Sequence, residues 1–204
     1  GSFDDKMPTA YEESWYSGDS PNQGHSTNNM FYYTNALDAV TLHASFTPSG
    51  VGAFESSVEL GAVVTAVDNL EIGFAVGEDN GTSTAVDNTI MYAKYTMGAA
   101  TFGVQSNEAD SAAANSDEEF VAASVSYAVS EDVSVSYGIS ELKFEAIGTE
   151  AQEARGLSAS YTMGSMTLAG TLNNIKNQGA GATGAQATND AESDTYEINL
   201  SFAF

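Results

Sequence analysis

Acidic side chains dominate the residues of this chain that could do chemistry. The 204 residues contain 28 Asp and Glu but only 5 Lys and Arg, which gives a formal net charge of −23. Such a surface attracts cations, and it is not expected to bind nucleic acid, because neutralising phosphates takes Lys and Arg. The chain also has no Cys, which excludes disulfides, thiol nucleophiles and thiolate metal sites.

One group of carboxylates lies in residues 1–29, a stretch rich in Gly, Pro, Ser and Asn that shows no sustained period and is typical of a loop. The members of this group are Asp4, Asp5, Glu12, Glu13 and Asp19. Acidic side chains that line a channel favour cations, so these residues are candidates for a pore constriction. The alternative is a solvated acidic loop.

Catalytic and metal-binding patterns are weak by comparison. His43 has no Ser or Asp partner next to it in the sequence, and catalysis would need a nucleophile and a base that converge. Residues 77–81, GEDNG, resemble part of a Ca²⁺ loop but lack its later carboxylates, which favours a turn. We expect no enzyme, no metal site and no cofactor, with loose binding of Ca²⁺ or Mg²⁺ at acidic loops as an alternative.

The elements that position these residues are strands. Residues 195–204, TYEINLSFAF, alternate strictly between apolar and polar side chains, and their length suits a tilted strand that crosses a bilayer, about 9–11 residues. The same period of two predicts strands over residues 30–35, 39–47, 55–66, 70–78, 88–97, 100–105, 119–129, 133–140, 155–163, 166–173 and 195–204. The connections between them are alternately short and long, as in outer-membrane barrels.

Charges within the predicted strands keep to the polar phase. Glu59, Glu71, Lys94 and Glu197 all lie there, which makes them candidates for the wall of a lumen; the alternative is the polar face of a soluble sheet. Around residues 141–144 the phase breaks, which indicates that this strand has left the membrane or holds a bulge.

A hairpin repeat adds an aromatic signal. Residues 95–98 and 161–164 both read Tyr-Thr-Met-Gly, and residues 127–130 are a looser copy. In each copy the Tyr is on the apolar phase just before a short turn, where a periplasmic aromatic girdle would lie. The predicted girdle residues are Tyr95, Tyr127 and Tyr161.

These hairpins, the terminal strand and the Ser-Val-Ser-Tyr strands at residues 124–127 and 134–137 together resemble the general porins of Gram-negative bacteria, in their alphaproteobacterial, marine-type branch. The resemblance implies an outer-membrane homotrimer of sixteen-stranded barrels, in contact with lipid and lipopolysaccharide. It makes Phe204 the C-terminal signal for barrel insertion. Counted back from Phe204, the strand at residues 30–35 is the sixth, which puts residues 1–29 in the position of the constriction loop and implies that five N-terminal strands are absent.

The sequence therefore predicts an all-β chain, an antiparallel transmembrane β-barrel of the porin type with about eleven C-terminal strands present. Residues 1–29 would be the constriction loop, and residues 30–204 would be barrel strands with short periplasmic turns and long extracellular loops. The expected function is passive diffusion of ions and small hydrophilic solutes, with a preference for cations. The alternatives are a soluble, secreted acidic β protein of the adhesin kind and an outer-membrane barrel enzyme.

Overall fold

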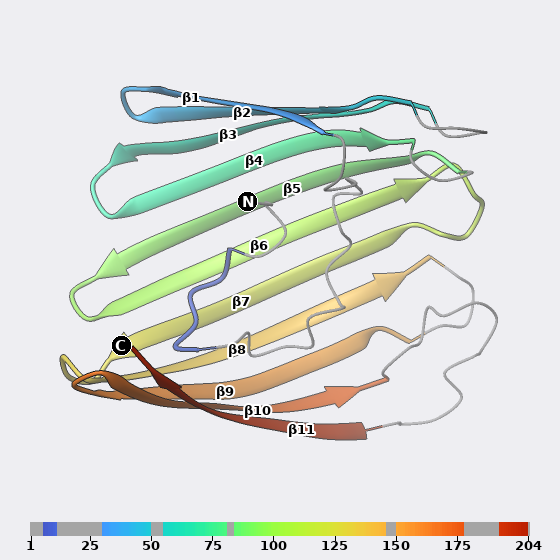
Figure 1. Cartoon of the computed structure of the whole chain (residues 1–204). Coiled ribbons are helices and arrows are strands. Elements are labelled where there is room, and N and C mark those ends of the chain that lie inside the picture. Colours follow the sequence, from blue (N-terminus) through green and yellow to red (C-terminus); the bar gives the residue numbers. More distant parts are fainter. Residues whose placement is uncertain are drawn as a thin grey trace.

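The computed structural model describes residues 6–11, 30–49, 55–80, 84–145, 150–177 and 192–203. These residues form eleven strands in a single antiparallel sheet, and each strand pairs with its neighbours in chain order (Figure 1). The strands are β1 Phe31–Leu37, β2 Val40–Thr47, β3 Ser57–Val67, β4 Leu70–Asp79, β5 Val86–Met97, β6 Ala100–Ser111, β7 Glu118–Ala128, β8 Val133–Phe144, β9 Gln152–Met163, β10 Met166–Lys176 and β11 Glu192–Phe202. No helix long and apolar enough to cross a membrane occurs among the described residues. The predicted all-β class and strand order are confirmed.

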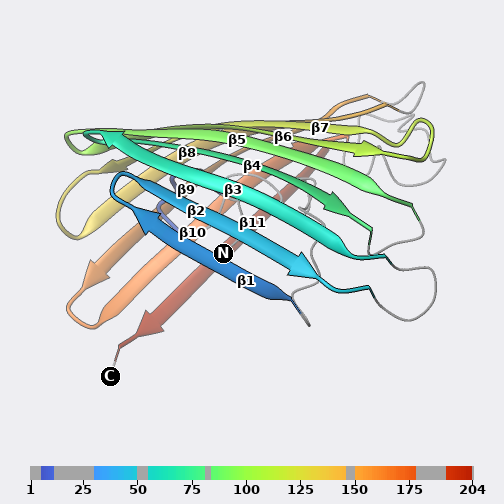
Figure 2. The same cartoon turned by 90° about the horizontal axis from the view of Figure 1, so that it is seen from above.

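The sheet curls into a trough. Figure 2 shows the strands following an arc, with residues 6–11 inside its concave face. The two edges of the trough are β1 and β11, which do not pair with each other, so the sheet does not close within the described chain. Short turns join the strands at one end of the trough and long connections at the other (Figure 1). We call these the short-turn end and the long-loop end.

Burial in the sheet is reversed relative to a water-soluble protein. The apolar phase of the strands points away from the concave face and is exposed, as for Leu60 at 56%, Val104 at 56% and Ile198 at 75%. The concave phase is polar and buried, as for Asn107 at 0% and Ser158 at 1%. A soluble sheet would bury the first phase and hydrate the second. The arrangement therefore gives no support to the soluble alternative and requires an apolar solvent outside the sheet.

A small apolar cluster interrupts the polar lining of the concave face. Ile90, Phe120 and Ile175 each have 0–1% exposure and belong to a buried cluster that also includes Met7. The strand residues lie toward the long-loop end of β5, β7 and β10. The sequence analysis missed this cluster because alternation identifies the two phases of a strand but not a local apolar patch on the polar phase.

The strands are longer than the sequence predicted, mostly at the long-loop end. β6 continues to Ser111 instead of residue 105, and β8 continues to Phe144 instead of residue 140. Near the long-loop end the outward phase changes from apolar to charged, so the alternation that marks a strand disappears although the pairing continues. Continuing the period of two across the charged residues would have located the long-loop ends of these strands.

The phase break at residues 141–144 is a change of residue type and not of backbone. β8 keeps a continuous register with β7 from Ala128↔Ser134 to Glu118↔Phe144, so a bulge is the wrong explanation there. The register irregularity among the described strands lies in β3, between Val64 and Val67.

The short turns show why the hairpins close where they do. Gly98 and Gly164 end the two Tyr-Thr-Met-Gly repeats with φ of 61°, in the left-handed region that glycine adopts without steric cost. Asp38 and Asn69 take the same conformation in two other short turns, with φ of 54° and 64°. Asn and Asp are the residues that tolerate it best after glycine.

Candidate channel wall and the segment that crosses it

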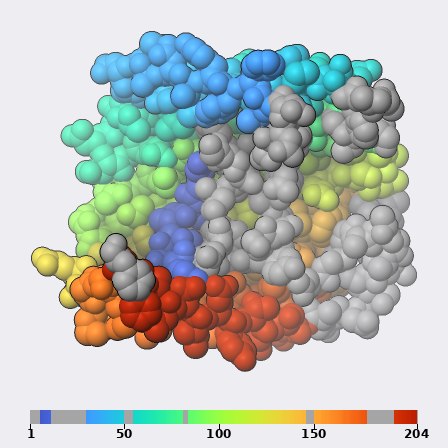
Figure 3. Space-filling model, in the orientation of Figure 1, coloured from blue at the N-terminus to red at the C-terminus, as the bar shows by residue number. Residues whose placement is uncertain are grey.

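Residues 6–11 lie across the concave wall. The backbone N–H of Lys6 donates to Oε1 of Gln105 on β6, at 3.1 Å. The hydroxyl of Ser124 on β7 donates to the carbonyl oxygen of Pro8, at 3.0 Å. Figure 3 shows this segment, coloured dark blue, inside the trough. These strand side chains therefore satisfy backbone groups that no ladder pairs.

The far end of the segment reaches the other side of the trough. The N–H of Ala10 donates to Oγ of Ser136 on β8, at 2.9 Å, and Ser136 itself hydrogen-bonds to Ser158 on β9. The hydroxyl of Tyr11 donates to Oε1 of Glu197 on β11, at 2.7 Å. The segment thus connects the middle of the sheet with its last strand.

Gly103 on β6 makes the close approach possible. A Cβ atom at this position would lie 2.4 Å from Cδ of Pro8 and 3.1 Å from Sδ of Met7. Met7 is buried, with 6% exposure. Only glycine leaves the space that these two side chains occupy against the wall.

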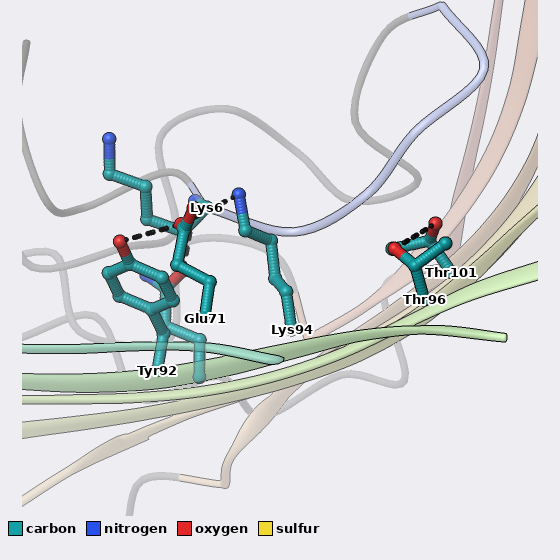
Figure 4. A network of polar contacts seen from close by, with 7 residues as sticks. Lys6, Glu71, Tyr92, Lys94, Thr96 and Thr101 are labelled. Atoms are coloured by element: carbon teal, nitrogen blue, oxygen red, sulfur yellow. Dashed lines mark hydrogen bonds and ion pairs between the residues drawn. The ribbon is translucent and has the colours of Figure 1, made fainter. Parts of the chain in front are cut away.

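A charged network lies on the wall beside this segment. Nζ of Lys94 on β5 lies 2.9 Å from Oε1 of Glu71 on β4, and the hydroxyl of Tyr92 donates to the same oxygen at 2.9 Å. Figure 4 shows these side chains and Lys6 on the same side of the sheet. The ring of Tyr92 occupies the place of a side chain at Gly73, where a Cβ atom would lie 2.0 Å from the ring. The network therefore has a fixed geometry, set by packing as well as by charge.

Two further carboxylates and a histidine occupy the β1 side of the wall. Oγ of Ser45 donates to Oε2 of Glu59 at 3.2 Å, and Oγ of Ser57 donates to Oδ1 of Asp79 at 3.1 Å. The ring of His43 hydrogen-bonds through Nδ1 to the hydroxyl of Tyr32. Each side chain belongs to the concave phase of its strand.

The concave face of the described chain is acidic overall. The carboxylates on it are Glu59, Glu71, Asp79, Glu118 and Glu197, and the two lysines are Lys6 and Lys94. Their formal sum is 2 − 5 = −3. All four lumen candidates, Glu59, Glu71, Lys94 and Glu197, lie on this face. Asp79 and Glu118 were missed, because they fall just beyond the ends of the predicted strands.

The other candidates divide into two groups. Tyr95, Tyr127 and Tyr161 point outward near the short-turn end, with exposures between 44% and 49%. Their role as an aromatic girdle stays a prediction. The constriction candidates Asp4, Asp5, Glu12, Glu13 and Asp19, together with Phe204, lie outside the described residues. Of residues 1–29, the structure describes residues 6–11, and the assignment of the whole stretch as a constriction loop also stays a prediction.

Metal binding has no support in the described part of the chain. No group of three or more His, Cys, Asp or Glu is close enough there to hold a metal ion. Loose association of divalent cations with the acidic loops is untested.

A curved antiparallel sheet with an apolar outside and a polar, charged inside is the wall of a membrane-spanning β-barrel. The chain belongs to the Gram-negative porin family, whose sequence profile matches residues 2–153. The family and the outward apolar surface place it in the outer membrane.

Solved porins share the fold at low sequence identity. An anion-selective porin from Comamonas acidovorans is 14% identical with a TM-score of 0.70; the match covers 86% of this chain and 58% of that one. A loop L8 deletion mutant of OmpT, an outer membrane protein of Vibrio cholerae, is 15% identical with a TM-score of 0.67, over 94% and 70% of the two chains. A triple mutant of the Rhodopseudomonas blastica porin is 17% identical with a TM-score of 0.60, over 100% and 64%.

These likenesses establish the fold alone. The chain spans 58% of the length of the Comamonas porin, and the selectivity in that porin's name belongs to that protein. A comparison with curated protein sequences finds no match.

Proposed function

We propose that this chain forms most of the wall of a water-filled channel, through which ions and small hydrophilic solutes diffuse passively across the outer membrane. The observation that carries the proposal is the reversed burial of the sheet, with Leu60 and Val104 exposed outward while charged side chains such as Glu71 line the concave face. Hydrocarbon outside and water inside satisfy both faces at once. An enzyme would need a nucleophile and a base that converge, and the family consists of porins.

Closure of the channel follows from the edges of the sheet. The backbone groups of β1 and β11 that face away from the sheet have no strand partner in the described chain. Unpaired strand edges are not tolerated in hydrocarbon, so further strands pair with them in the membrane. The family resemblance favours a homotrimer of such barrels, embedded among phospholipid and lipopolysaccharide. A trimer that survives SDS without heating is the expected gel result, and a monomer under those conditions would contradict it.

Cation preference is supported by the charge of the wall. Five carboxylates and two lysines face the concave side of the described chain, and a lumen of negative potential enriches cations over anions. The ammonium group of Lys94 lies 2.9 Å from Glu71 and neutralises that carboxylate, so the negative excess comes from the other four carboxylates against Lys6. Removing a wall carboxylate therefore lowers the preference for cations.

The test is the reversal potential of the protein in a planar bilayer under a KCl gradient. We expect K⁺ selectivity in the wild type, and a shift toward Cl⁻ in the double variant Glu71→Gln/Glu197→Gln, because the wall then loses two negative charges. Glu108→Gln is the matched control: Glu108 faces outward on β6, so its loss leaves the reversal potential unchanged. Anion selectivity in the wild type would refute the cation preference, and a protein that forms no conducting pore would refute the channel.

A further inference from the structure

Three of the five basic residues of the chain lie together on the outward face. They are Lys143 on β8, Arg155 on β9 and Lys176 on β10, each within four residues of the long-loop end of its strand. Exposed apolar side chains, including Ile139 and Leu157, follow on the same outward phase toward the short-turn end. The outward face therefore changes from apolar to cationic over a short distance on these three strands.

A depression of about 570 Å³ lies where the outward face changes from apolar to cationic. Its walls include the apolar side chains Val121 and Ile139 and the charged side chains Glu141, Lys143, Glu153, Arg155 and Lys176. Their formal sum is 3 − 2 = +1, in a chain whose net charge is −23. This local cationic excess has no counterpart on the outward face of β4 to β7, whose strand charges are all acidic: Glu78, Asp87, Glu108, Asp110 and Glu119.

The three basic side chains differ in how closely neighbouring carboxylates pair with them. Nζ of Lys143 lies 3.1 Å from Glu141 and 3.5 Å from Glu119. Among the described residues, Arg155 and Lys176 have no carboxylate within 4.0 Å, although Glu153 on β9 and Glu192 on β11 are the register partners of Lys176. Arg155 and Lys176 are thus available to an external anion, and a guanidinium group can bind phosphate through two parallel hydrogen bonds.

We propose that this depression binds the phosphate head group of an anionic lipid in the membrane leaflet at the long-loop end. Arg155 and Lys176 would hold the phosphate, and the acyl chains would lie over Ile139 and Leu157. Charge complementarity supports this occupant, and the apolar wall beside the cations suits an amphiphile better than a free ion. The inference rests on the outer-membrane location of the chain and does not depend on conductance.

The experiment measures lipid retention by native mass spectrometry. The protein is equilibrated in detergent micelles that contain equal amounts of phosphatidic acid and phosphatidylcholine with identical acyl chains. We expect preferential retention of phosphatidic acid, and an affinity at least about tenfold lower in Arg155→Gln/Lys176→Gln, because both charge-assisted contacts are lost. Lys143→Gln should have a smaller effect, since Glu119 and Glu141 already hold its ammonium group.

The matched control is Asp87→Asn, at the same end of the outward face but on β5, three strands away from Lys143 and outside the lining of the depression. It should leave the retention of phosphatidic acid unchanged. Equal retention of the two lipids, or equal affinity in the wild type and the double variant, would overturn the proposal. So would retention that is lost on chelation with EDTA, because carboxylates and divalent cations would then hold the lipid.

Two further outcomes keep the test decisive. If the double variant does not fold, the retention of phosphatidic acid by the wild type is measured at increasing salt. Retention should fall between roughly 50 mM and 500 mM NaCl, because salt screens contacts between opposite charges. Retention that does not depend on salt would refute the proposal. If the double substitution dissociates an oligomer without changing lipid retention, the occupant is a second copy of the chain and the proposal is wrong. A wild-type protein that retains phosphatidic acid but does not conduct would refute the channel and leave this inference standing.

Discussion

The concave and outward faces of the same eleven strands follow opposite rules for polar groups. On the concave face, Tyr92 and Lys94 both bind the carboxylate of Glu71, and these contacts fix the positions of the three side chains. On the outward face, side chains such as Val104 and Ile198 are exposed and have no polar partner to satisfy. The difference teaches that particular contacts specify the concave face, whereas the apolar part of the outward face is specified by the absence of charge.

The outward face itself divides along the strands. From the short-turn end to about two thirds of the length of β6, the outward residues are apolar or small, and then Glu108 and Asp110 follow. The same change occurs on β8, where Ile139 is followed by Glu141 and Lys143. The position of this change marks where the hydrocarbon ends, since charges on the lipid-facing side are tolerated only near the interface.

The largest expected effect comes from placing a charge in the apolar part of the outward face. Val104→Lys should lower the free energy of unfolding by roughly 2–4 kcal/mol, because the ammonium group would enter hydrocarbon. The measurement is urea unfolding in phosphatidylcholine vesicles, followed by electrophoresis without heating. Glu108→Lys, on the same phase of the same strand, is the control, and it should change the free energy by about 0–1 kcal/mol. Equal losses in the two variants would mean that hydrocarbon does not contact this face.

A substitution on the concave face should act through a steric clash and not through a change of solvent. Gly103→Ala would place Cβ 2.4 Å from Cδ of Pro8, so residues 6–11 must shift from the wall. We expect a loss of roughly 1–3 kcal/mol in the free energy of unfolding, as for overpacking elsewhere, together with a changed single-channel conductance.

Pro8→Ala/Gly103→Ala tests whether that clash is the cause. Removing Cδ removes the closest atom, so the double variant should regain most of the stability that Gly103→Ala loses. Additive losses in the double variant would show that Gly103 is needed for the strand itself and not for the segment packed on it.

The comparison of the two faces also explains which parts of the protein the sequence could predict. The concave positions of Glu59, Glu71 and Lys94 follow from strict alternation, because a strand with a period of two assigns each side chain to a face. Asp79 and Glu118 were missed because the outward residues next to them are charged, as Glu78 and Glu119 are, and the alternation disappears there.

Contacts between distant segments could not be read from the sequence at all. The hydrogen bond from Tyr11 to Glu197 joins residues 186 positions apart. Nothing in the period of either stretch encodes this pairing, which depends on the curvature of the sheet and on the space left by Gly103. The outward cluster of Lys143, Arg155 and Lys176 was likewise hidden, because it appears only when the registers of β8, β9 and β10 are known.

The smallest expected effect tests the acidic part of the outward face. Asp87 on β5 is the register partner of Glu78 on one side and of Asp110 on the other. Like charges directly opposite each other destabilise a sheet, so Asp87→Asn should raise the free energy of unfolding by roughly 0.2–1 kcal/mol at low ionic strength. The gain should disappear in about 1 M salt, where the Debye length falls to about 3 Å. Asp194→Asn should show the opposite sign, because Asp194 faces Asn174 and accepts a hydrogen bond from it at 2.9 Å. If Asp87→Asn instead lowers the stability and EDTA lowers the wild type to the same level, bound divalent cations offset the repulsion along this row of carboxylates.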